Sequence, residues 1–240
     1  MKNPTISVVI IAYNEEKYIS KTLDSLMRQT VKPEEIIVVD NNSKDRTAEI
    51  ARGYKGVRVV SETEQGRSPA RNKGFKEAQG NILLKMDADT ILKEDFIENL
   101  KRLFLKEKNI VGAVSNVSFS EYIWKILFSF NLKSCMTQIF LGYKTCPGAA
   151  FILTKEAWKK IKRNICNDDK RVHEDIELSL HLSNVGRVIY TKDCKAITSS
   201  RNVTKVAKEY VIRYLKQHWQ DRGLLRRFRI LWGNRSPYKK

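Results

Sequence analysis

The chain has 240 residues, 42% of them hydrophobic and 30% charged, a composition that fits a folded globular protein and excludes a largely disordered one. This length suits one large domain, or a domain with a tail. No uninterrupted apolar stretch reaches the roughly 18 to 20 residues that cross a bilayer, and the N-terminus lacks the apolar core of a signal peptide. We therefore expect a cytoplasmic protein.

Positive charge is concentrated in the second half of the chain. The net charge is +18, and Lys and Arg exceed Asp and Glu by 15 in residues 121–240 but by only 3 in residues 1–120. A basic half indicates an anionic partner, such as nucleotide phosphates, acidic lipid headgroups or nucleic acid, or else a well-solvated surface. Charge alone leaves these possibilities open.

The cysteines form no recognisable framework. There are four of them, without C-x-x-C spacing: Cys135, Cys146, Cys166 and Cys194. We expect free thiols in a reducing compartment, and neither zinc nor disulfides.

Short apolar runs alternate with helical patterns in the first half of the chain. The runs at 6–12, 35–40, 57–60 and 82–86 lack polar alternation, as expected for strands that are buried on both faces. Helical patterns lie between them, at about 19–27, 45–52 and 68–78. This order predicts βαβ crossovers and a parallel sheet.

Acidic side chains follow three of these four strands. Glu15 comes after the first, Asp40 ends the second, and Asp87 and Asp89 follow the fourth. Ligands of parallel sheets bind at the carboxyl ends of the strands, and two carboxylates one residue apart suit a divalent cation that bridges phosphates. The pattern therefore predicts a nucleotide and metal site.

A simpler interpretation of the Asp-x-Asp pair is a turn with a helix cap, in which Asp89 or Thr90 starts a helix at Lys93. The sequence contains neither G-x-G-x-x-G nor G-x-x-x-x-G-K-[ST]. Neither a dinucleotide-binding fold nor a P-loop is therefore supported.

Four segments carry a family resemblance: SVVIIAYNEE at 7–16, IIVVDNNSKDRT at 36–47, GRSPARNKG at 66–74 and LKMDAD at 84–89. In this order and spacing they resemble family 2 glycosyltransferases of the GT-A fold. The resemblance implies an α/β fold with a Rossmann-like, mostly parallel sheet flanked by helices. It also implies a nucleotide-sugar donor, usually a UDP-sugar, and a Mn²⁺ or Mg²⁺ ion.

The resemblance assigns roles residue by residue. Asp40 would accept a hydrogen bond from uracil N3–H, a charge-assisted bond that can select uracil, and Asp89 would ligate the metal. Arg67 or Arg71 would lie near the base or diphosphate, although a surface helix cation is an equal alternative for Arg71. The other implied donor contacts are Ala12, Tyr13, Glu15, Asp87 and Ala88.

The second half should hold the acceptor. Residues 110–119 are patterned as a strand, and residues 122–140 suggest a buried helix, with a membrane-facing or acceptor-covering flap as the alternative. Residues 146–154 resemble the family's strand beneath the acceptor site, where Gly148 would permit close backbone approach.

An acidic pair opens a predicted helix at Glu174 and Asp175. Both acids could cap that helix, and His173 beside them is expected to be polar surface rather than a metal ligand. The resemblance implies instead that Asp175 is the catalytic base, with Glu174 on the acceptor side. A base is needed because a sugar hydroxyl is a poor nucleophile, and attack opposite the leaving UDP would invert the anomeric carbon.

The last forty residues form a basic, aromatic-rich, amphipathic pattern. It predicts a helical tail that lies on an anionic membrane surface, or one that packs on the catalytic domain. We expect a catalytic domain at 1–200, with a donor half at 1–109 and an acceptor half at 110–200, and the tail at 201–240. The Q-x-x-R-W motif of processive synthases is absent, which favours single additions.

The sequence thus predicts a metal-assisted, inverting glycosyltransferase with a glycan or lipid-linked acceptor, in the cytoplasm or on the cytoplasmic face of a membrane. Transfer to a polyprenyl phosphate, which needs no base, is the rival enzyme hypothesis. A basic nucleic-acid-binding protein is a third hypothesis, but it leaves the aligned acids unexplained, so no nucleic acid partner is expected.

Overall fold

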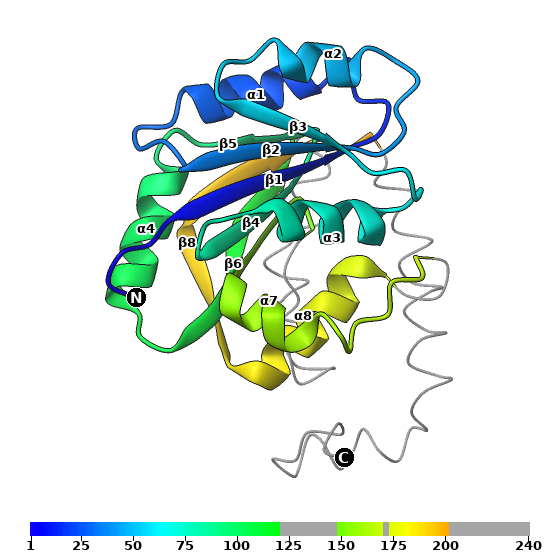
Figure 1. Ribbon diagram of the computed structural model, residues 1–240. Coiled ribbons are helices and arrows are strands. Elements are labelled where there is room, and N and C mark those ends of the chain that lie inside the picture. The colour runs from blue at the N-terminus through cyan, green and yellow to red at the C-terminus, as the bar shows by residue number, and fades with distance from the viewer. Residues whose placement is uncertain (121–147, 170–172, 202–240) are drawn as a thin grey trace.

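The computed structural model describes residues 1–120, 148–169 and 173–201 (Figure 1). The predicted helix or flap at 122–140, Cys135, Cys146 and the tail beyond Arg201 lie outside these residues. Within them, Cys166 and Cys194 are free thiols. No helix in the described part of the chain is long and apolar enough to cross a membrane.

The first half forms the parallel part of an eight-stranded sheet. Its strands are β1 (Ile6–Ala12), β2 (Glu35–Asp40), β3 (Val57–Ser61) and β4 (Ile82–Asp87). They pair in the parallel order β3-β2-β1-β4, so the four predicted strands and their direction are confirmed. The apolar runs are continuous because both faces of β1 are covered by helices.

The chain after β4 extends this sheet with mixed pairing. Its strands are β5 (Thr90–Leu92), β6 (Ile110–Phe119), β7 (Ala150–Thr154) and β8 (Arg187–Thr198). Strand β7 runs antiparallel between β4 and β6, while β8 is parallel to β6 and antiparallel to β5. The sheet is therefore parallel from β3 to β4 and mixed beyond β4. Strands β5 and β8 were not predicted.

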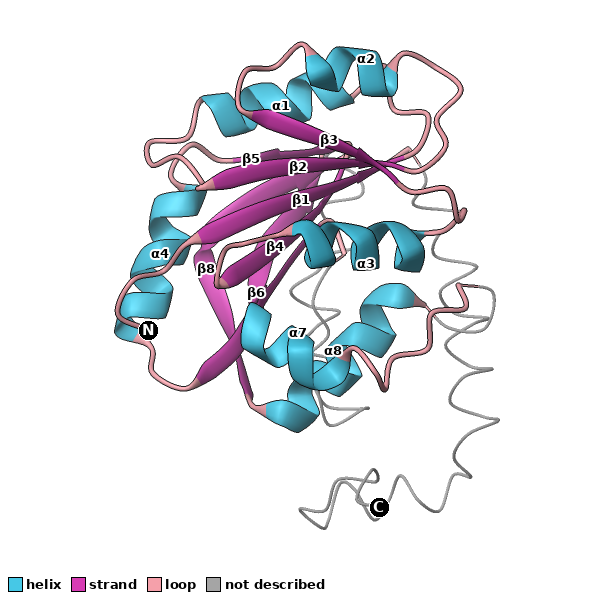
Figure 2. Ribbon diagram, viewed as in Figure 1, coloured by secondary structure: helices cyan, strands magenta, loops and turns pink. Residues whose placement is uncertain are grey.

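Helices cover both faces of the sheet (Figures 1 and 2). On one face lie α1 (Ile19–Met27), α2 (Thr47–Arg52) and α4 (Phe96–Lys106). On the other lie α3 (Arg67–Glu77), α7 (Lys155–Ile161) and α8 (Glu174–Val185). The two apolar layers give the three-layer α/β architecture that the alternating pattern predicted.

Two local features explain how these elements fit. A Cβ on Gly74 of α3 would lie 2.2 Å from a methyl of Val9, so only glycine lets α3 pack this closely on β1. After β4 the chain enters β5 at Thr90, and α4 begins only at Phe96. The interpretation of Asp89 or Thr90 as the start of a helix at Lys93 is therefore wrong, because pairing with β8 keeps this segment extended.

Candidate active site

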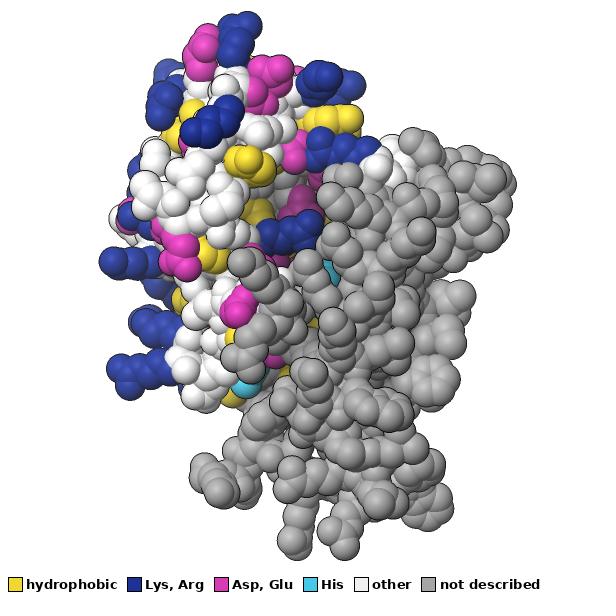
Figure 3. Space-filling model, turned by 90° about the vertical axis from the view of Figure 1, so that its right-hand side faces the viewer, with side chains coloured by type: hydrophobic (Ala, Val, Ile, Leu, Met, Phe, Trp, Pro, Cys, Tyr) yellow, Lys and Arg dark blue, Asp and Glu magenta, His cyan; other side chains and the backbone are white. Residues whose placement is uncertain are grey.

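The carboxyl ends of β1, β2 and β4 meet at one edge of the sheet. Ala12 is the register partner of Asp40, and Asp87 is paired one residue earlier on β1, with Ile11. Asp40 Oδ1 is buried and accepts no hydrogen bond from the described part of the chain, whereas Tyr13 is 48% exposed. Figure 3 faces this edge and shows acidic side chains in a hollow beside basic ones.

Asp89 and Glu15 share one cation, the guanidinium of Arg201. Arg201 is hydrogen-bonded to Glu15, lies 3.2 Å from Asp89 Oδ2 and stacks on the Tyr18 ring at 4.2 Å. Burial, reinforced by Asp87 and opposed by Arg201, raises the pKa of Asp89 to about 6. Burial likewise raises the pKa of Glu15.

These carboxylates fit a divalent cation. Both are hard oxygen donors that already surround a positive charge, and Glu15 Oε2 is buried without a hydrogen-bond partner among the described residues. No group of three or more His, Cys, Asp or Glu side chains in the described ranges could hold an ion by itself. An ion here would need further ligands from a bound diphosphate or from water.

Lys85, from the interior of β4, is a buried cation that the sequence analysis did not assign. Its Nζ donates to Asp87 Oδ1 at 2.9 Å, to the Gly148 carbonyl at 2.9 Å and to Glu174 Oε2 at 3.3 Å. Burial disfavours its charge, but the carboxylates of Asp87, Glu174 and Asp175 outweigh burial and raise the pKa of Lys85. A lysine inside an apolar strand was the signal that could have found it.

Glu174 is a partner of buried cations and not a helix cap. It pairs with Arg71 at 3.0 Å and with Lys85 at 3.3 Å, and these side chains are at most 2% exposed. Although burial alone would raise the pKa of Glu174, Lys85 and Arg71 outweigh it and lower that pKa.

Arg71 is not a surface cation, contrary to one of the two expectations for it. Its side chain is 0% exposed, pairs with Glu174, donates to Asn167 at 3.2 Å and lies 5.5 Å from the Trp158 ring centre. With no exposed surface, the guanidinium has no face left for a donor diphosphate. The buried carboxylate of Glu174, supplied by α8, is the physical reason for this position.

Asp175 stands in the first turn of α8, against the turn that precedes β7. Its side chain is 21% exposed and lies 3.7 Å from Lys85 Nζ, and its Oδ1 accepts no hydrogen bond from the described residues. A Cβ on Gly148 would lie 2.1 Å from Asp175 Oδ2, so the backbone approaches closely here. Burial, with Glu174 and Asp87 and against Lys85, raises the pKa of Asp175 well above its usual value. His173 is buried 3.9 Å away, so the expectation of polar surface is wrong.

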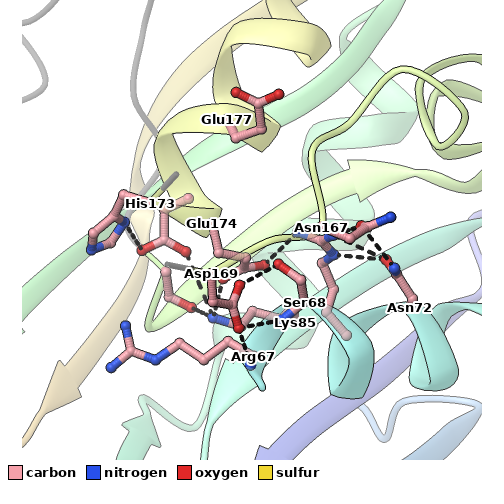
Figure 4. A network of polar contacts seen from close by, with 12 residues as sticks. Arg67, Ser68, Asn72, Lys85, Asn167, Asp169, His173, Glu174 and Glu177 are labelled. Carbon is pink, nitrogen blue, oxygen red and sulfur yellow. Dashed lines mark hydrogen bonds and ion pairs between the residues drawn. The ribbon is translucent and has the colours of Figure 1, made fainter. Parts of the chain in front are cut away.

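Arg67 and Asp169 complete the wall of the site (Figure 4). Asp169 accepts from the backbone N–H groups of Arg67 at 2.6 Å and Ser68 at 3.1 Å, and so caps α3 from a distant loop. Burial opposes the charge of Arg67, but Asp87, Asp175 and Glu174 outweigh it and raise its pKa. Arg67 is an exposed residue with these carboxylates near its charge, whereas Asp169 had no sequence signal.

The mixed sheet, with acids at the end of β4, in the loop after β1 and at the start of α8, is the arrangement of GT-A α/β proteins. The family model described as glycosyl transferase family 2 matches residues 7–162. The chain belongs to this family, as the resemblance of its four segments predicted.

Known proteins that are similar to this chain are themselves named as glycosyltransferases. The putative glycosyltransferase EpsH of Bacillus subtilis (strain 168) is 33% identical over an alignment of 115 positions that covers 46% of this chain and 33% of EpsH. The chain spans a third or less of the first curated relatives that it matches.

A longer match is the dolichyl N-acetyl-alpha-D-glucosaminyl phosphate 3-beta-D-2,3-diacetamido-2,3-dideoxy-beta-D-glucuronosyltransferase of Methanococcus voltae. It is 25% identical over an alignment of 256 positions that covers 95% of this chain and 76% of that protein. Among solved structures, the mannosyltransferase PcManGT from Pyrobaculum calidifontis, in complex with GDP-Man and Mn²⁺, has a TM-score of 0.71 at 19% identity. That alignment covers 96% of this chain and 68% of PcManGT, and it shows a shared fold.

Proposed function

We propose that this chain is a metal-assisted, inverting glycosyltransferase that moves a sugar from a UDP-sugar to a hydroxyl of a glycan or lipid-linked acceptor. One observation carries the proposal: the ammonium of Lys85 binds Asp87 at 2.9 Å and Asp175 at 3.7 Å. The family resemblance implies a donor role for Asp87 and a base role for Asp175. These two residues are distant in the sequence, and both contact the buried Nζ of Lys85.

Donor binding is proposed at the ends of the parallel strands. The free Oδ1 of Asp40 is a buried acceptor that suits the N3–H of uracil, next to Ala12 and the exposed ring of Tyr13. Asp87 and Ala88 would line the ribose or sugar. Arg67, which is exposed, is the candidate for the diphosphate, whereas the buried Arg71 is withdrawn from that role.

Asp89, with Glu15 beside it, is the proposed metal ligand. A bound Mn²⁺ or Mg²⁺ would act as a Lewis acid and neutralise the charge that develops on the leaving UDP. The chain's own contribution is to hold hard carboxylate oxygens there, where they already surround a cation.

Asp175 is the proposed base. It would take the proton of the acceptor hydroxyl as the oxygen attacks the anomeric carbon, and the burial that raises its pKa makes the carboxylate a stronger base. Attack opposite UDP is a single displacement with inversion, without a covalent intermediate on the chain. Gly148 and Glu174 support this side of the site.

The proposals for acceptor and location rest on the name of one relative and on the charge of the tail. The name of the Methanococcus voltae relative describes transfer to a dolichyl-phosphate-linked sugar, which favours a lipid-linked acceptor. The basic tail at 201–240 would hold the catalytic domain, residues 1–200, on the anionic cytoplasmic face of a membrane. Donor and acceptor halves at 1–109 and 110–200 complete the proposed organisation.

The test is a panel of UDP-sugars and GDP-mannose, incubated with the purified chain, a glycan or lipid-linked acceptor and Mn²⁺ or Mg²⁺. We expect one UDP-sugar to yield an inverted product, with Asp175→Asn inactive and the exposed control Asp95→Asn fully active. Transfer to a polyprenyl phosphate that survives Asp175→Asn would favour the rival enzyme function, because an ionised phosphate needs no base. Absence of metal-dependent activity with every donor would refute the proposal.

A further inference from the structure

Lys85 occupies a position where a charged side chain is unfavourable. It lies in the middle of β4, between the apolar residues Leu84 and Met86. Although its side chain carries a charge, Lys85 is only 1% exposed. An ammonium ion loses its hydration in such a place, and a well-packed apolar side chain would often serve stability equally well. Its presence therefore calls for an explanation other than packing.

The partners of Lys85 come from three separate elements. Asp87 ends β4 itself, the Gly148 carbonyl belongs to the turn before β7, and Glu174 and Asp175 open α8. One ammonium thus connects the strand that presents the donor-site acid to the helix that presents the base. In Figure 4 Lys85 and Glu174 lie together at the centre of this network.

We propose that Lys85 is a positioning residue that holds the Asp175 carboxylate in register with Asp87, so that base and donor meet at a fixed separation. This inference rests on the proposed function, in which Asp175 is the base. Gly148 connects the two side chains, because it contacts both Lys85 and Asp175. The carbonyl that binds Lys85 belongs to the residue whose missing Cβ makes room for Asp175.

The same geometry has a consequence for proton transfer. The charged and titratable groups that face Asp175 are Lys85 and Asp87 from β4, His173 and Glu174 from the start of α8, and Arg67 from α3. Lys85 is the nearest of the cations and favours the ionised carboxylate. Without Lys85, the pKa of Asp175 rises further, and the base is protonated at a higher pH.

The experiment compares neutral substitutions of Lys85 with a matched control. Lys85→Met removes the charge at similar length, and Lys85→Gln keeps a donor for the Gly148 carbonyl should the first variant fold poorly. Arg71→Met is the control, because it removes an equally buried cation from the same Glu174 without touching Asp87 or Asp175. Lys85→Arg tests rescue by a cation of different shape.

We expect both neutral variants to lower kcat about 100-fold at neutral pH, the scale of a misplaced catalytic group. The acidic limb of the kcat profile should move up by about one to three pH units, as expected for the loss of an opposite charge within a few ångströms. Calorimetric affinity for UDP with Mn²⁺ should change little. Arg71→Met should lower stability but leave the acidic limb in place, and Lys85→Arg should restore part of the lost rate.

The outcomes distinguish the proposed base role of Asp175 from the proposed positioning role of Lys85. If Asp175→Asn retains transfer, the proposed base is wrong whatever Lys85 does. If Asp175→Asn is inactive but a folded Lys85→Met or Lys85→Gln keeps the wild-type kcat and acidic limb, the positioning role of Lys85 is refuted. An equal shift of the limb in Arg71→Met would also refute it, because general loosening of the core would then suffice.

Discussion

The buried charge network makes a quantitative prediction about Glu174. This carboxylate pairs with two cations, Arg71 at 3.0 Å and Lys85 at 3.3 Å, and no side chain of the three is more than 2% exposed. Glu174→Gln retains the shape of the side chain but leaves both cations without a countercharge at this position. We expect it to lower the free energy of unfolding by about 3 to 5 kcal/mol, the range for removing one partner of a buried pair.

The effect should depend on pH with a defined sign. Because the folded-state pKa of Glu174 is lowered, its stabilising contribution is complete above the unfolded-state pKa, about 4.3. The contribution declines as the pH falls below that value toward the folded-state pKa. The stability difference between the wild type and Glu174→Gln should therefore be constant near neutral pH and shrink in acid.

Urea unfolding followed by circular dichroism at several pH values measures this difference. The matched control is Glu49→Gln, whose partner Arg46 lies beside it on an exposed helix surface, with both side chains at least 67% exposed. The control should show no measurable change. A loss below about 1 kcal/mol for Glu174→Gln, or a loss that grows in acid, would show that the pair does not stabilise the fold as described.

Three further predictions concern the site itself. Gly148→Ala would place a Cβ 2.1 Å from Asp175 Oδ2, so kcat should fall about 100-fold while UDP affinity persists; unchanged transfer would contradict the close approach. Arg201→Ala should tighten Mn²⁺ binding, because the guanidinium no longer competes with the ion for the carboxylates of Glu15 and Asp89. Electron paramagnetic resonance measures this binding, and weaker binding in the variant would show that Arg201 assists the ion. Mn²⁺ affinity should decline as the pH falls through about 6, the pKa of Asp89, and a flat titration would exclude that ligand.

The fold was predictable where long apolar runs made the pattern unambiguous. Strands β1, β2 and β4 are continuous runs covered on both faces, and helices between them fixed their parallel direction. Strand β5 has only three residues, too few for a periodic signal. Strand β8 mixes exposed polar and buried residues irregularly and is paired with strands far away in the sequence, so no local pattern marks it.

The site was predictable only in part. Asp87, Asp89 and Asp175 belong to motifs, whereas Asp169 and Arg201 reach the site through contacts between distant segments that the sequence does not reveal. Arg71 was misjudged for the same reason. Helix α3 is mostly polar, with few apolar side chains besides Ala70 and Phe75 to mark its buried face, so the burial of Arg71 depends on a countercharge from α8 that only the fold supplies.

The most direct test of the central claim is calorimetric titration of UDP into the purified chain with Mn²⁺ and again with a chelator. The proposed site predicts binding that requires the ion, that Asp40→Asn weakens and that Asp89→Ala abolishes. The exposed Asp95→Asn should bind like the wild type. Failure of UDP to bind in the presence of Mn²⁺ or Mg²⁺, or equal binding with and without the ion, would contradict a metal-assisted nucleotide-sugar site on this edge of the sheet.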